Sequence, residues 1–268
     1  MTHISVEISV TSGGSLFEIL STLRSSGVDL DIIVINSGDN KKVPVYCRKF
    51  NAKEIREKCS LLKSRYLGTV NSDGDSILIL DETRVPSVGL VNSLENIHNL
   101  MVAFPEVQKG RGIINWLDGF DKDLVTRNGN SMVGGVSLII PRFYPTKVLK
   151  EAFDEIIRKL GKGAFERIVA KDDRIIFFEV SNLLNSTPVI SKHPLYHINN
   201  TNIIREVEKY SRYGRTSRLL KNTDYEFMIR LSDKMRKFSS PRELPLLFLY
   251  LLRGLSYEAG YHLGSKIK

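Results

Sequence analysis

The chain has 268 residues, 42% hydrophobic and 26% charged. This is the composition of an ordinary soluble globular protein, and it excludes a collagen, a disordered chain and a polytopic membrane protein. The net charge is +9, but residues 1–190 hold 24 Lys and Arg against 23 Asp and Glu, whereas residues 191–268 hold 15 against 7. A neutral body with a basic C-terminal quarter predicts a local anionic partner, such as a pyrophosphate or lipid headgroups, rather than a nucleic acid.

The cellular compartment is predicted from the cysteines and from the N-terminus. Cys47 and Cys59 are the only cysteines, too few for a disulfide framework or a structural zinc site, which favours a reducing compartment. The first residues lack the basic segment and the continuous apolar stretch of a signal peptide. We therefore predict a cytoplasmic protein, with the inner face of the membrane as a second location.

The first half of the sequence alternates strands with helices. Residues 4–10 and 31–35 are predicted strands, with a helix between them. A second helix is predicted over residues 52–67 with Gly68 as its C-terminal stop, and a buried strand over residues 76–80 ends at Asp81. This order predicts an α/β fold in which helices cover both faces of a mostly parallel sheet.

Helices dominate the second half. A strand is predicted over residues 136–140, a helix over 146–160 and another strand over 175–180. From residue 201 the pattern is helical, with a charged helix that ends near Lys237 and a final apolar helix after Pro241 and Pro245. We expect one domain over residues 1–200 and a helical C-terminal extension over residues 201–268 packed on it.

Polar residues follow each of the first three predicted strands. Thr11 and Ser12 come after the first strand, Asn36 and Asp39 after the second, and the pair Asp81-Glu82 after the third. The carboxyl ends of parallel strands form the ligand crevice of an α/β sheet, so these residues are candidates for ligand binding. The alternative is turn chemistry, because Asn, Asp and Ser favour turns for conformational reasons alone.

The same segments resemble motifs of the nucleotide-sugar glycosyltransferases of family 2, in the order and spacing of that family. The resemblance rests on segments 8–14 (ISVTSGG), 33–38 (IVINSG), 64–81 with Arg65 on a helix and Asp81 ending a strand, 132–140 around two glycines, 171–178 (KDDRIIFF), Tyr196-His197 and Tyr213-Gly214-Arg215. It implies a Rossmann-like GT-A fold and the inverting transfer of a sugar from a nucleoside diphosphate donor to a hydroxyl of a saccharide or lipid-linked acceptor.

The resemblance also implies residue roles. Asp173 would be the base for the acceptor hydroxyl, with Asp172 beside it as the other candidate. Asp81, together with Glu82 or His197, would hold Mg²⁺ or Mn²⁺. The implied donor-binding residues are Thr11, Ser12, Asn36, Asp39, Arg65, Asp81, Glu82, Gly134, Gly135 and Arg215.

Each of these roles has a structural alternative. If residues 172 and 173 begin a strand, only one of their side chains can face the site, and both could be solvent-facing turn residues. Arg65 near a helix C-terminus is also favoured by the helix dipole alone. A single His such as His197 is often structural, and an Arg on a charged helix such as Arg215 is usually solvated.

Two departures from the family pattern concern the donor site. Asn36 stands where the family usually has Asp, which changes the hydrogen-bonding groups next to the nucleotide base. The Asp-x-Asp metal motif reads Asp81-Glu82-Thr83, and the loss of the last carboxylate should weaken binding of a divalent cation. Residues 73–75 (DGD) also spell the tripeptide but precede the strand, so we interpret them as a turn.

The last predicted helix has an apolar stretch of only eight residues, 245–252. A bilayer span takes roughly 20 residues, so this helix is too short to cross. Basic residues precede it, namely Lys234, Arg236, Lys237 and Arg242, so it could lie in a membrane interface beside an anionic acceptor. Core packing or a homodimer contact is the alternative.

Other function classes fit the sequence less well. A sugar-phosphate nucleotidyltransferase opens with a basic, Gly-rich phosphate loop, whereas residues 11–15 (TSGGS) hold no Lys or Arg. A non-catalytic nucleotide-sugar-binding relative would explain the degenerate metal motif. A nucleic-acid-binding module ranks last, because the positive charge lies in one segment with few interleaved aromatic residues.

Overall fold

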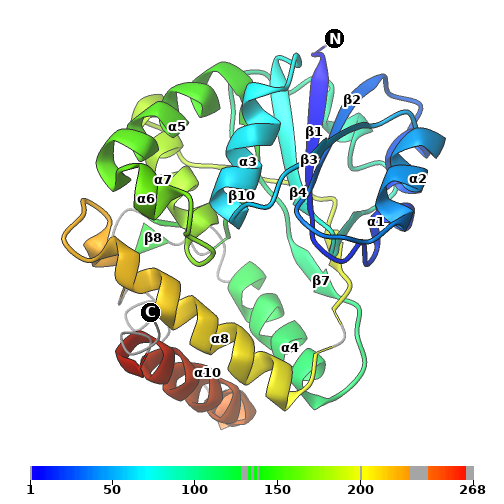
Figure 1. Ribbon diagram of the computed structural model, residues 1–268. Coiled ribbons are helices and arrows are strands. Elements are labelled where there is room, and N and C mark those ends of the chain that lie inside the picture. The colour runs from blue at the N-terminus through cyan, green and yellow to red at the C-terminus, as the bar shows by residue number, and fades with distance from the viewer. Residues whose placement is uncertain are drawn as a thin grey trace.

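The computed structural model describes residues 2–127, 132–133, 136–137, 139–199, 201–229 and 241–263 (Figure 1). Its main sheet has seven strands in the order β11-β6-β10-β4-β1-β2-β3. Strands β1 (Ile4–Val10), β2 (Leu30–Asn36), β3 (Lys53–Arg56) and β4 (Ser76–Asp81) are parallel. Strand β10 (Pro141–Pro145) runs antiparallel between β4 and β6 (Val102–Ala103), and β11 (Val189–Ile190) is parallel to β6.

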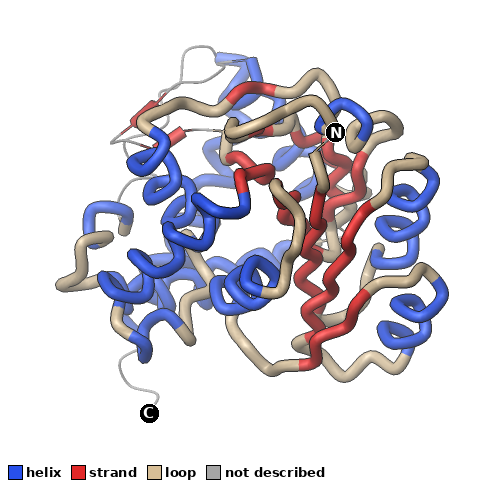
Figure 2. The backbone as a smooth tube through the Cα atoms, turned by 90° about the horizontal axis from the view of Figure 1, so that it is seen from above, coloured by secondary structure: helices blue, strands red, loops and turns tan. Residues whose placement is uncertain are grey.

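Helices cover both faces of this sheet, as the sequence predicts (Figures 1 and 2). Helices α1 (Leu16–Ser25) and α2 (Lys42–Lys49) bury Leu16, Leu20 and Val43 in one apolar cluster with Ile8 and Leu80. Helices α3 (Leu61–Val70), α5 (Thr146–Leu160) and α7 (Asp172–Leu184) contribute to the other cluster, with Ile77 and Ile79 of β4. Alternate residues of β4 thus pack on opposite faces, as the pleat of a strand requires.

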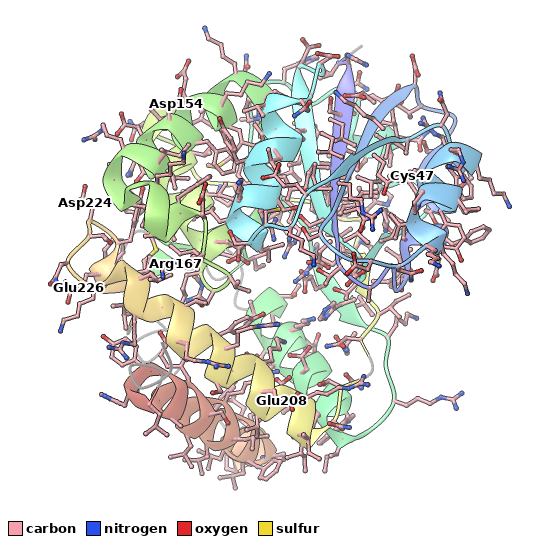
Figure 3. All side chains as sticks on the ribbon, viewed as in Figure 1. Cys47, Asp154, Arg167, Glu208, Asp224 and Glu226 are labelled. Atoms are coloured by element: carbon pink, nitrogen blue, oxygen red, sulfur yellow. The ribbon has the colours of Figure 1, made fainter. Side chains whose placement is uncertain are left out.

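The outer faces of the helices are charged, in contrast to their inner faces. Asp154 on α5 and Glu208 on α8 (Ile203–Ser217) are exposed, whereas Cys47 on α2 is buried against the sheet (Figure 3). Burial raises the pKa of the Cys47 thiol to about 11, with a smaller contribution from Glu54. The thiol of Cys47 is therefore protonated and inert at neutral pH.

A second layer lies below the carboxyl end of the main sheet in Figure 1. It contains a small sheet of β5 (Arg84–Pro86), β12 (Leu195–His197) and β7 (Glu106–Gln108), and helix α4 (Ile113–Arg127). Helices α8 and α10 (Leu244–Leu263) pack side by side, and α10 also packs on α4 through Leu246 and Leu249. The remaining described elements are the strand pair β8 (Met132–Val133) and β9 (Val136–Ser137), the short helix α6 (Lys162–Phe165), and 3-10 turns at 92–94, 218–220, 226–228 and 241–243.

The helix predicted over residues 52–67 is confirmed over residues 61–67, which lie in α3, and wrong over its first half. Residues 53–56 form the edge strand β3, in which Ile55 pairs with Ile35, and α3 begins only after Ser60, whose hydroxyl accepts a hydrogen bond from the Lys63 amide at 3.3 Å. The helix-like spacing of Ile55 and Cys59 with later residues therefore spans two elements. Helix α2, which the sequence analysis missed, contains Pro44 in its first turn, where proline is tolerated.

Two later strand predictions also fail. Residues 175–180 lie inside α7, where most of them are buried; a short apolar run does not distinguish a strand from a buried helix. The strand expected at residues 136–140 is limited to β9, and the strand that joins the main sheet is β10, at residues 141–145. The helix predicted over residues 146–160 is confirmed as α5.

Gly68 was predicted to end its helix, but it lies within α3, against the side chain of Glu7 on β1. A Cβ at residue 68 would lie 2.0 Å from Glu7 Cγ. We expect Gly68→Ala to lower the free energy of unfolding by about 1–3 kcal/mol, because overpacking a buried contact displaces both elements. The matched control is Gly163→Ala, since a Cβ there meets no atom within 4 Å. Urea unfolding of both variants measures the difference, and equal midpoints would contradict the prediction.

Candidate functional site

The parallel register brings the predicted donor-binding residues to one edge of the sheet. Val10 pairs with Asn36, and Ser9 pairs with Asp81, so Thr11, Asn36 and Asp81 all lie at the carboxyl ends of adjacent strands. All three are buried central strands of the same sheet, and their register aligns their carboxyl ends. The sheet edge is therefore the shared floor of the candidate site.

Glu82 organises the loop that follows β1. Its carboxylate accepts hydrogen bonds from the backbone amides of Thr11 (3.3 Å), Ser12 (2.8 Å) and Gly13 (2.5 Å), and from the Ser12 hydroxyl at 3.0 Å. The backbone carbonyl of Glu82 also accepts from the Ser15 amide at 3.1 Å. Glu82 therefore fixes the shape of this loop, and its oxygens already have donors.

Asp81 is engaged by its own neighbours. Its carboxylate accepts from the Thr83 amide at 3.0 Å and from the Thr83 hydroxyl at 2.5 Å, and it forms an ion pair with Arg84. Burial would raise the pKa of Asp81, but Arg84 and Arg142 outweigh burial and hold it below its ordinary value. Asp81 is thus a carboxylate at neutral pH, with a guanidinium as its charge partner.

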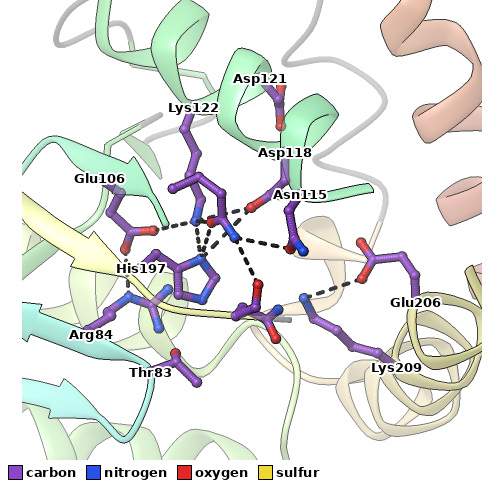
Figure 4. A network of polar contacts seen from close by, with 12 residues as sticks. Thr83, Arg84, Glu106, Asn115, Asp118, Asp121, Lys122, His197, Glu206 and Lys209 are labelled. Carbon is purple, nitrogen blue, oxygen red and sulfur yellow. Dashed lines mark hydrogen bonds and ion pairs between the residues drawn. The ribbon is translucent and has the colours of Figure 1, made fainter. Parts of the chain in front are cut away.

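A network of buried charges runs from Arg84 through Glu106 and Lys122 to Asp118 (Figure 4), and Arg253 extends it to the C-terminal helices. Arg84 Nε lies 2.6 Å from Glu106 Oε1, and Lys122 Nζ lies 3.1 Å from Glu106 Oε2 and 3.1 Å from Asp118 Oδ2. Arg253 of α10 then bridges Asp118 at 2.8 Å and Glu206 of α8 at 2.5 Å. Charges alternate in sign along the network, which is what the burial of so many ions requires.

His197 lies in the middle of this network. Its Nδ1 atom is 2.8 Å from Gln108 Oε1 and 3.8 Å from Asp118 Oδ2, and it also contacts Lys122. Burial lowers the pKa of His197, and the nearby Asp118 carboxylate offsets this only in part. His197 is therefore neutral at pH 7, held by polar partners on β7 and α4.

A pocket of about 740 Å³ opens between strands β5 and β12 of the small sheet and helices α4, α7, α8 and α10. The predicted donor-binding residues Thr11, Asn36, Arg65 and Asp81 are not among the residues that line it. Its charged lining residues are six cations, namely Arg84, Lys122, Lys171, Arg174, Lys209 and Arg253, and four acids, namely Asp118, Asp172, Asp173 and Glu258. Four tyrosines also line it, namely Tyr210, Tyr213, Tyr250 and Tyr257. The excess of cations suits an anionic ligand, and the aromatic faces suit the apolar face of a sugar ring.

The adjacent acids Asp172 and Asp173 begin α7 and have different surroundings. Asp172 is buried and its Oδ2 atom lies 2.6 Å from Arg65 Nε, whereas Asp173 is only partly buried. Burial raises the pKa of Asp172 to about 6 against the opposing effect of Arg65. The prediction of an extended segment at residues 172–173 is wrong, because both residues are in the first helical turn. Both still line the pocket, with Asp173 the more accessible carboxylate.

Other predicted donor residues have partners of their own. Asn36 donates to Glu54 at 2.8 Å and accepts from the Gly38 amide at 3.1 Å. Asp39 is exposed and pairs with Arg56 at 3.3 Å, and Arg215 is exposed on α8 and is not among the residues that line the pocket. Gly134 and Gly135 lie outside the described residues.

Four residues of the network were not predicted from the sequence, namely Arg84, Glu106, Lys122 and Arg253. Arg84 directly follows the degenerate metal motif, so a basic residue at that place was a usable signal. The other three come from β7, α4 and α10, and no spacing along the chain connects them.

These contacts bear on whether the site suits a divalent cation. In the described part of the chain, no group of three or more His, Cys, Asp or Glu side chains could hold a metal ion. Asp81 faces a guanidinium, Glu82 is bound by backbone amides, and His197 contacts a lysine. Mg²⁺ and Mn²⁺ prefer several free oxygen ligands, so the residues present do not fit such an ion.

The fold is that of the GT-A glycosyltransferases: a mostly parallel sheet flanked by helices, with a C-terminal helix. S. aureus TarS, residues 1–349, matches with a TM-score of 0.50 and 14% identity over 99% of this chain and 75% of that one. Glucosyl-3-phosphoglycerate synthase from Mycobacterium tuberculosis, in complex with Mn²⁺, UDP and glucosyl-3-phosphoglycerate, matches with a TM-score of 0.52 and 12% identity over 82% and 78%. No protein-family model matches the sequence, and no curated protein matches it either.

The hydrogen bonds between the Glu82 carboxylate and the loop after β1 lead to a prediction about nucleotide affinity. We expect Glu82→Gln to weaken nucleotide binding about tenfold, because an amide cannot accept from three amides as a carboxylate does and the loop loses its shape. The matched control is Glu57→Gln, which removes a carboxylate whose ion pair is with Lys63, away from this loop. Calorimetric titration with UDP measures the affinities, and equal affinity in both variants would contradict the role of Glu82.

Proposed function

We propose that the protein is an inverting glycosyltransferase, of the family 2 type, that transfers a sugar from a nucleoside diphosphate donor to a hydroxyl acceptor. The observation that carries the proposal is the position of Asp173, a partly buried carboxylate on the wall of a cationic pocket beside the carboxyl end of the sheet. The GT-A fold supports the donor class, since ligands of such sheets bind at that edge.

The proposed reaction assigns a task to each side of the pocket. Asp173 accepts the proton of the acceptor hydroxyl while the hydroxyl oxygen forms a bond to the anomeric carbon. The bond from that carbon to the nucleoside diphosphate breaks, and the electron pair leaves with the phosphate oxygen. The opposite direction of attack and departure inverts the anomeric centre.

The acceptor half of the pocket is built by α8 and α10. Tyr210, Tyr213 and Tyr257 offer aromatic faces, and Lys209 and Arg253 offer charge. Lys209 Nζ lies 5.5 Å from the centre of the Tyr210 ring and 5.8 Å from that of Tyr213. A saccharide or lipid-linked saccharide that carries negative charge is the acceptor class with matching chemistry.

A thermal-shift screen tests the donor class. The purified chain is heated with UDP, GDP, dTDP or CMP, each with EDTA and with Mn²⁺, because a ligand that binds only the folded state raises the melting temperature. We expect a shift with one nucleoside diphosphate. The absence of a shift with every nucleotide would contradict the proposed donor class. Product formation from the matching nucleotide sugar then separates an enzyme from a binding protein.

One face of α10 supports a contact with a membrane surface. No described helix is both long and apolar enough to span a bilayer. The exposed large apolar side chains of α10 that share this face are Leu244, Leu247, Phe248, Leu251 and Leu255, and four basic residues precede or begin the segment in sequence. Such a face can insert among anionic headgroups. Flotation with phosphatidylglycerol vesicles tests this, and a stable dimer without vesicle binding would assign the face to a second copy.

A further inference from the structure

Arg84 directly follows the degenerate metal motif in the sequence, and its side chain lines the pocket. It is the first residue of β5, and it pairs across the strands with His197 of β12, so the backbone fixes its place. Its guanidinium contacts Asp81 and Glu106, and it lines the pocket with its side chain only 17% exposed. A permanent positive charge therefore occupies the position next to the carboxylate that would otherwise bind a cation.

Arg84 shares its partner Glu106 with two other buried cations. Arg142 lies 3.5 Å from Glu106 through Nε, and Lys122 lies 3.1 Å from Glu106 and 3.1 Å from Asp118. Arg142 is only 5% exposed and has no hydrogen-bond partner for Nη1 among the described residues. Arg84 differs from Arg142 in lining the pocket, so its guanidinium is the one of the two that an anion in the pocket can reach.

We propose that Arg84 supplies the positive charge that stabilises the departing diphosphate, in place of a divalent cation. This inference rests on the proposed glycosyltransferase function. As the bond from the anomeric carbon to the phosphate oxygen breaks, that oxygen keeps the electron pair and accepts hydrogen bonds from the Arg84 guanidinium. Asp173 takes the acceptor proton in the same step, so no other reactant is needed. Asp81 and Glu106 are positioning residues that hold the guanidinium at the pocket.

The chemistry of arginine makes the proposal specific. A guanidinium stays protonated at every pH at which the protein is folded, and its fork of donors matches phosphate oxygens. Nucleoside diphosphate binding should therefore be insensitive to metal. Glu82, the middle residue of the degenerate motif, is already bound by the loop after β1, and Thr83 donates to Asp81. Neither side chain remains as a free ligand for a cation.

The experiment is calorimetric titration of the full chain with UDP, in EDTA and in Mn²⁺. If another nucleoside diphosphate gives the larger thermal shift, that one is the probe. We expect the wild-type affinity to change less than about threefold between the two conditions. Arg84→Gln should weaken binding in EDTA by about 10- to 100-fold, the effect of one lost hydrogen bond to a charged group. Arg84→Lys should recover part of the loss, because charge remains without the fork.

The control and a second variant keep the result interpretable. Arg158→Gln removes an exposed arginine on α5, paired only with Glu155, and should leave binding unchanged. Thr83→Asp restores the family's Asp-x-Asp pattern, and when combined with Arg84→Gln it should bind UDP more tightly with Mn²⁺ than in EDTA. This double variant tests the exchange of arginine for metal even if Arg84→Gln alone binds too weakly to measure.

The outcomes distinguish this inference from the function on which it rests. Wild-type binding that appears only with Mn²⁺ would overturn the role of Arg84 and leave the glycosyltransferase proposal standing. Unchanged affinity of Arg84→Gln in EDTA would do the same. If the wild-type chain binds no nucleoside diphosphate under either condition, both proposals fail.

Discussion

Replacing Asp173 with Asn should reduce sugar transfer about 10²- to 10⁴-fold and leave nucleotide affinity nearly unchanged, because the amide cannot accept the acceptor proton. The substitution conserves size, and Asp173 has a partly exposed position on the first turn of α7, so the fold should persist. The measurement is the rate of nucleoside diphosphate release with a donor and acceptor that the wild-type protein uses, beside a calorimetric titration with the nucleotide alone.

The control for Asp173 is another carboxylate that lines the pocket, on a different helix and with no assigned task. Glu258 of α10 lines the pocket, is exposed and pairs with His262 at 3.1 Å. Glu258→Gln should keep most of the activity. If Asp173→Asn loses nucleotide binding rather than turnover, Asp173 contributes to the donor site and another group is the base.

The central sheet was predictable because its strands are buried on both faces. The strands β1, β2 and β4 are rich in Ile, Val and Leu, and polar turn residues bound them. Both ends of helix α5 were predicted correctly because, unlike these strands, the helix is buried on one face only. Its apolar residues recur at helical spacing, with Leu149, Phe153 and Ile156 inward and charged residues outward. In both cases the local pattern and the tertiary surroundings agree.

Helix α7 was mistaken for a strand because burial removes its periodicity. Ile175, Ile176 and Phe177 are all buried among α3, α5 and the sheet, so no polar face marks the helix. The error matters for the site, because it changes how Asp172 and Asp173 are expected to point. In a helix adjacent side chains are about 100° apart, so one can pair with Arg65 while its neighbour lines the pocket.

The charge network was not predictable from the sequence. Glu106, Lys122 and Arg253 lie on three different elements. From the sequence alone, each would be expected to be solvated, as charged residues usually are. Their burial follows only from the packing of α4, α8 and α10 over the sheet edge. The family motifs indicated Asp81 and Asp173 as candidates, and the contact between Arg84 and Asp81 is local, between residues three apart in the sequence.

The ion pair between Arg65 and Asp172 should be the most sensitive point for stability. Their side chains are 4% and 7% exposed, and the atoms Nε and Oδ2 lie 2.6 Å apart. Removing one partner leaves a buried charge without compensation, which typically lowers the free energy of unfolding by about 3–5 kcal/mol. We expect losses of this size for Asp172→Ala and for Arg65→Met, measured by urea unfolding at pH 8, where both groups are charged.

Arg65→Met should be the more destabilising of the two, because Arg65 also faces Glu7. Burial raises the pKa of Glu7 to about 7, and Arg65 opposes the rise. A carboxyl whose folded pKa exceeds its unfolded value stabilises the fold below the unfolded value and loses that contribution as pH rises through the folded value. Without Arg65 the pKa of Glu7 rises further, so the loss of stability should extend to higher pH in Arg65→Met. Asp172→Ala keeps Arg65 beside Glu7 and should not show this extension.

A double variant and an exposed pair complete the test. Arg65→Met combined with Asp172→Leu replaces both charges with apolar groups, and such replacements are often neutral, so it should recover much of the stability lost in the single variants. Glu155→Gln breaks the exposed pair with Arg158 and should change the unfolding midpoint little, because solvent already screens that pair. If the losses from Arg65→Met and Asp172→Ala simply add in the double variant, the two residues are not coupled. The position of Asp172 would then have to be explained by helix packing rather than by its ion pair.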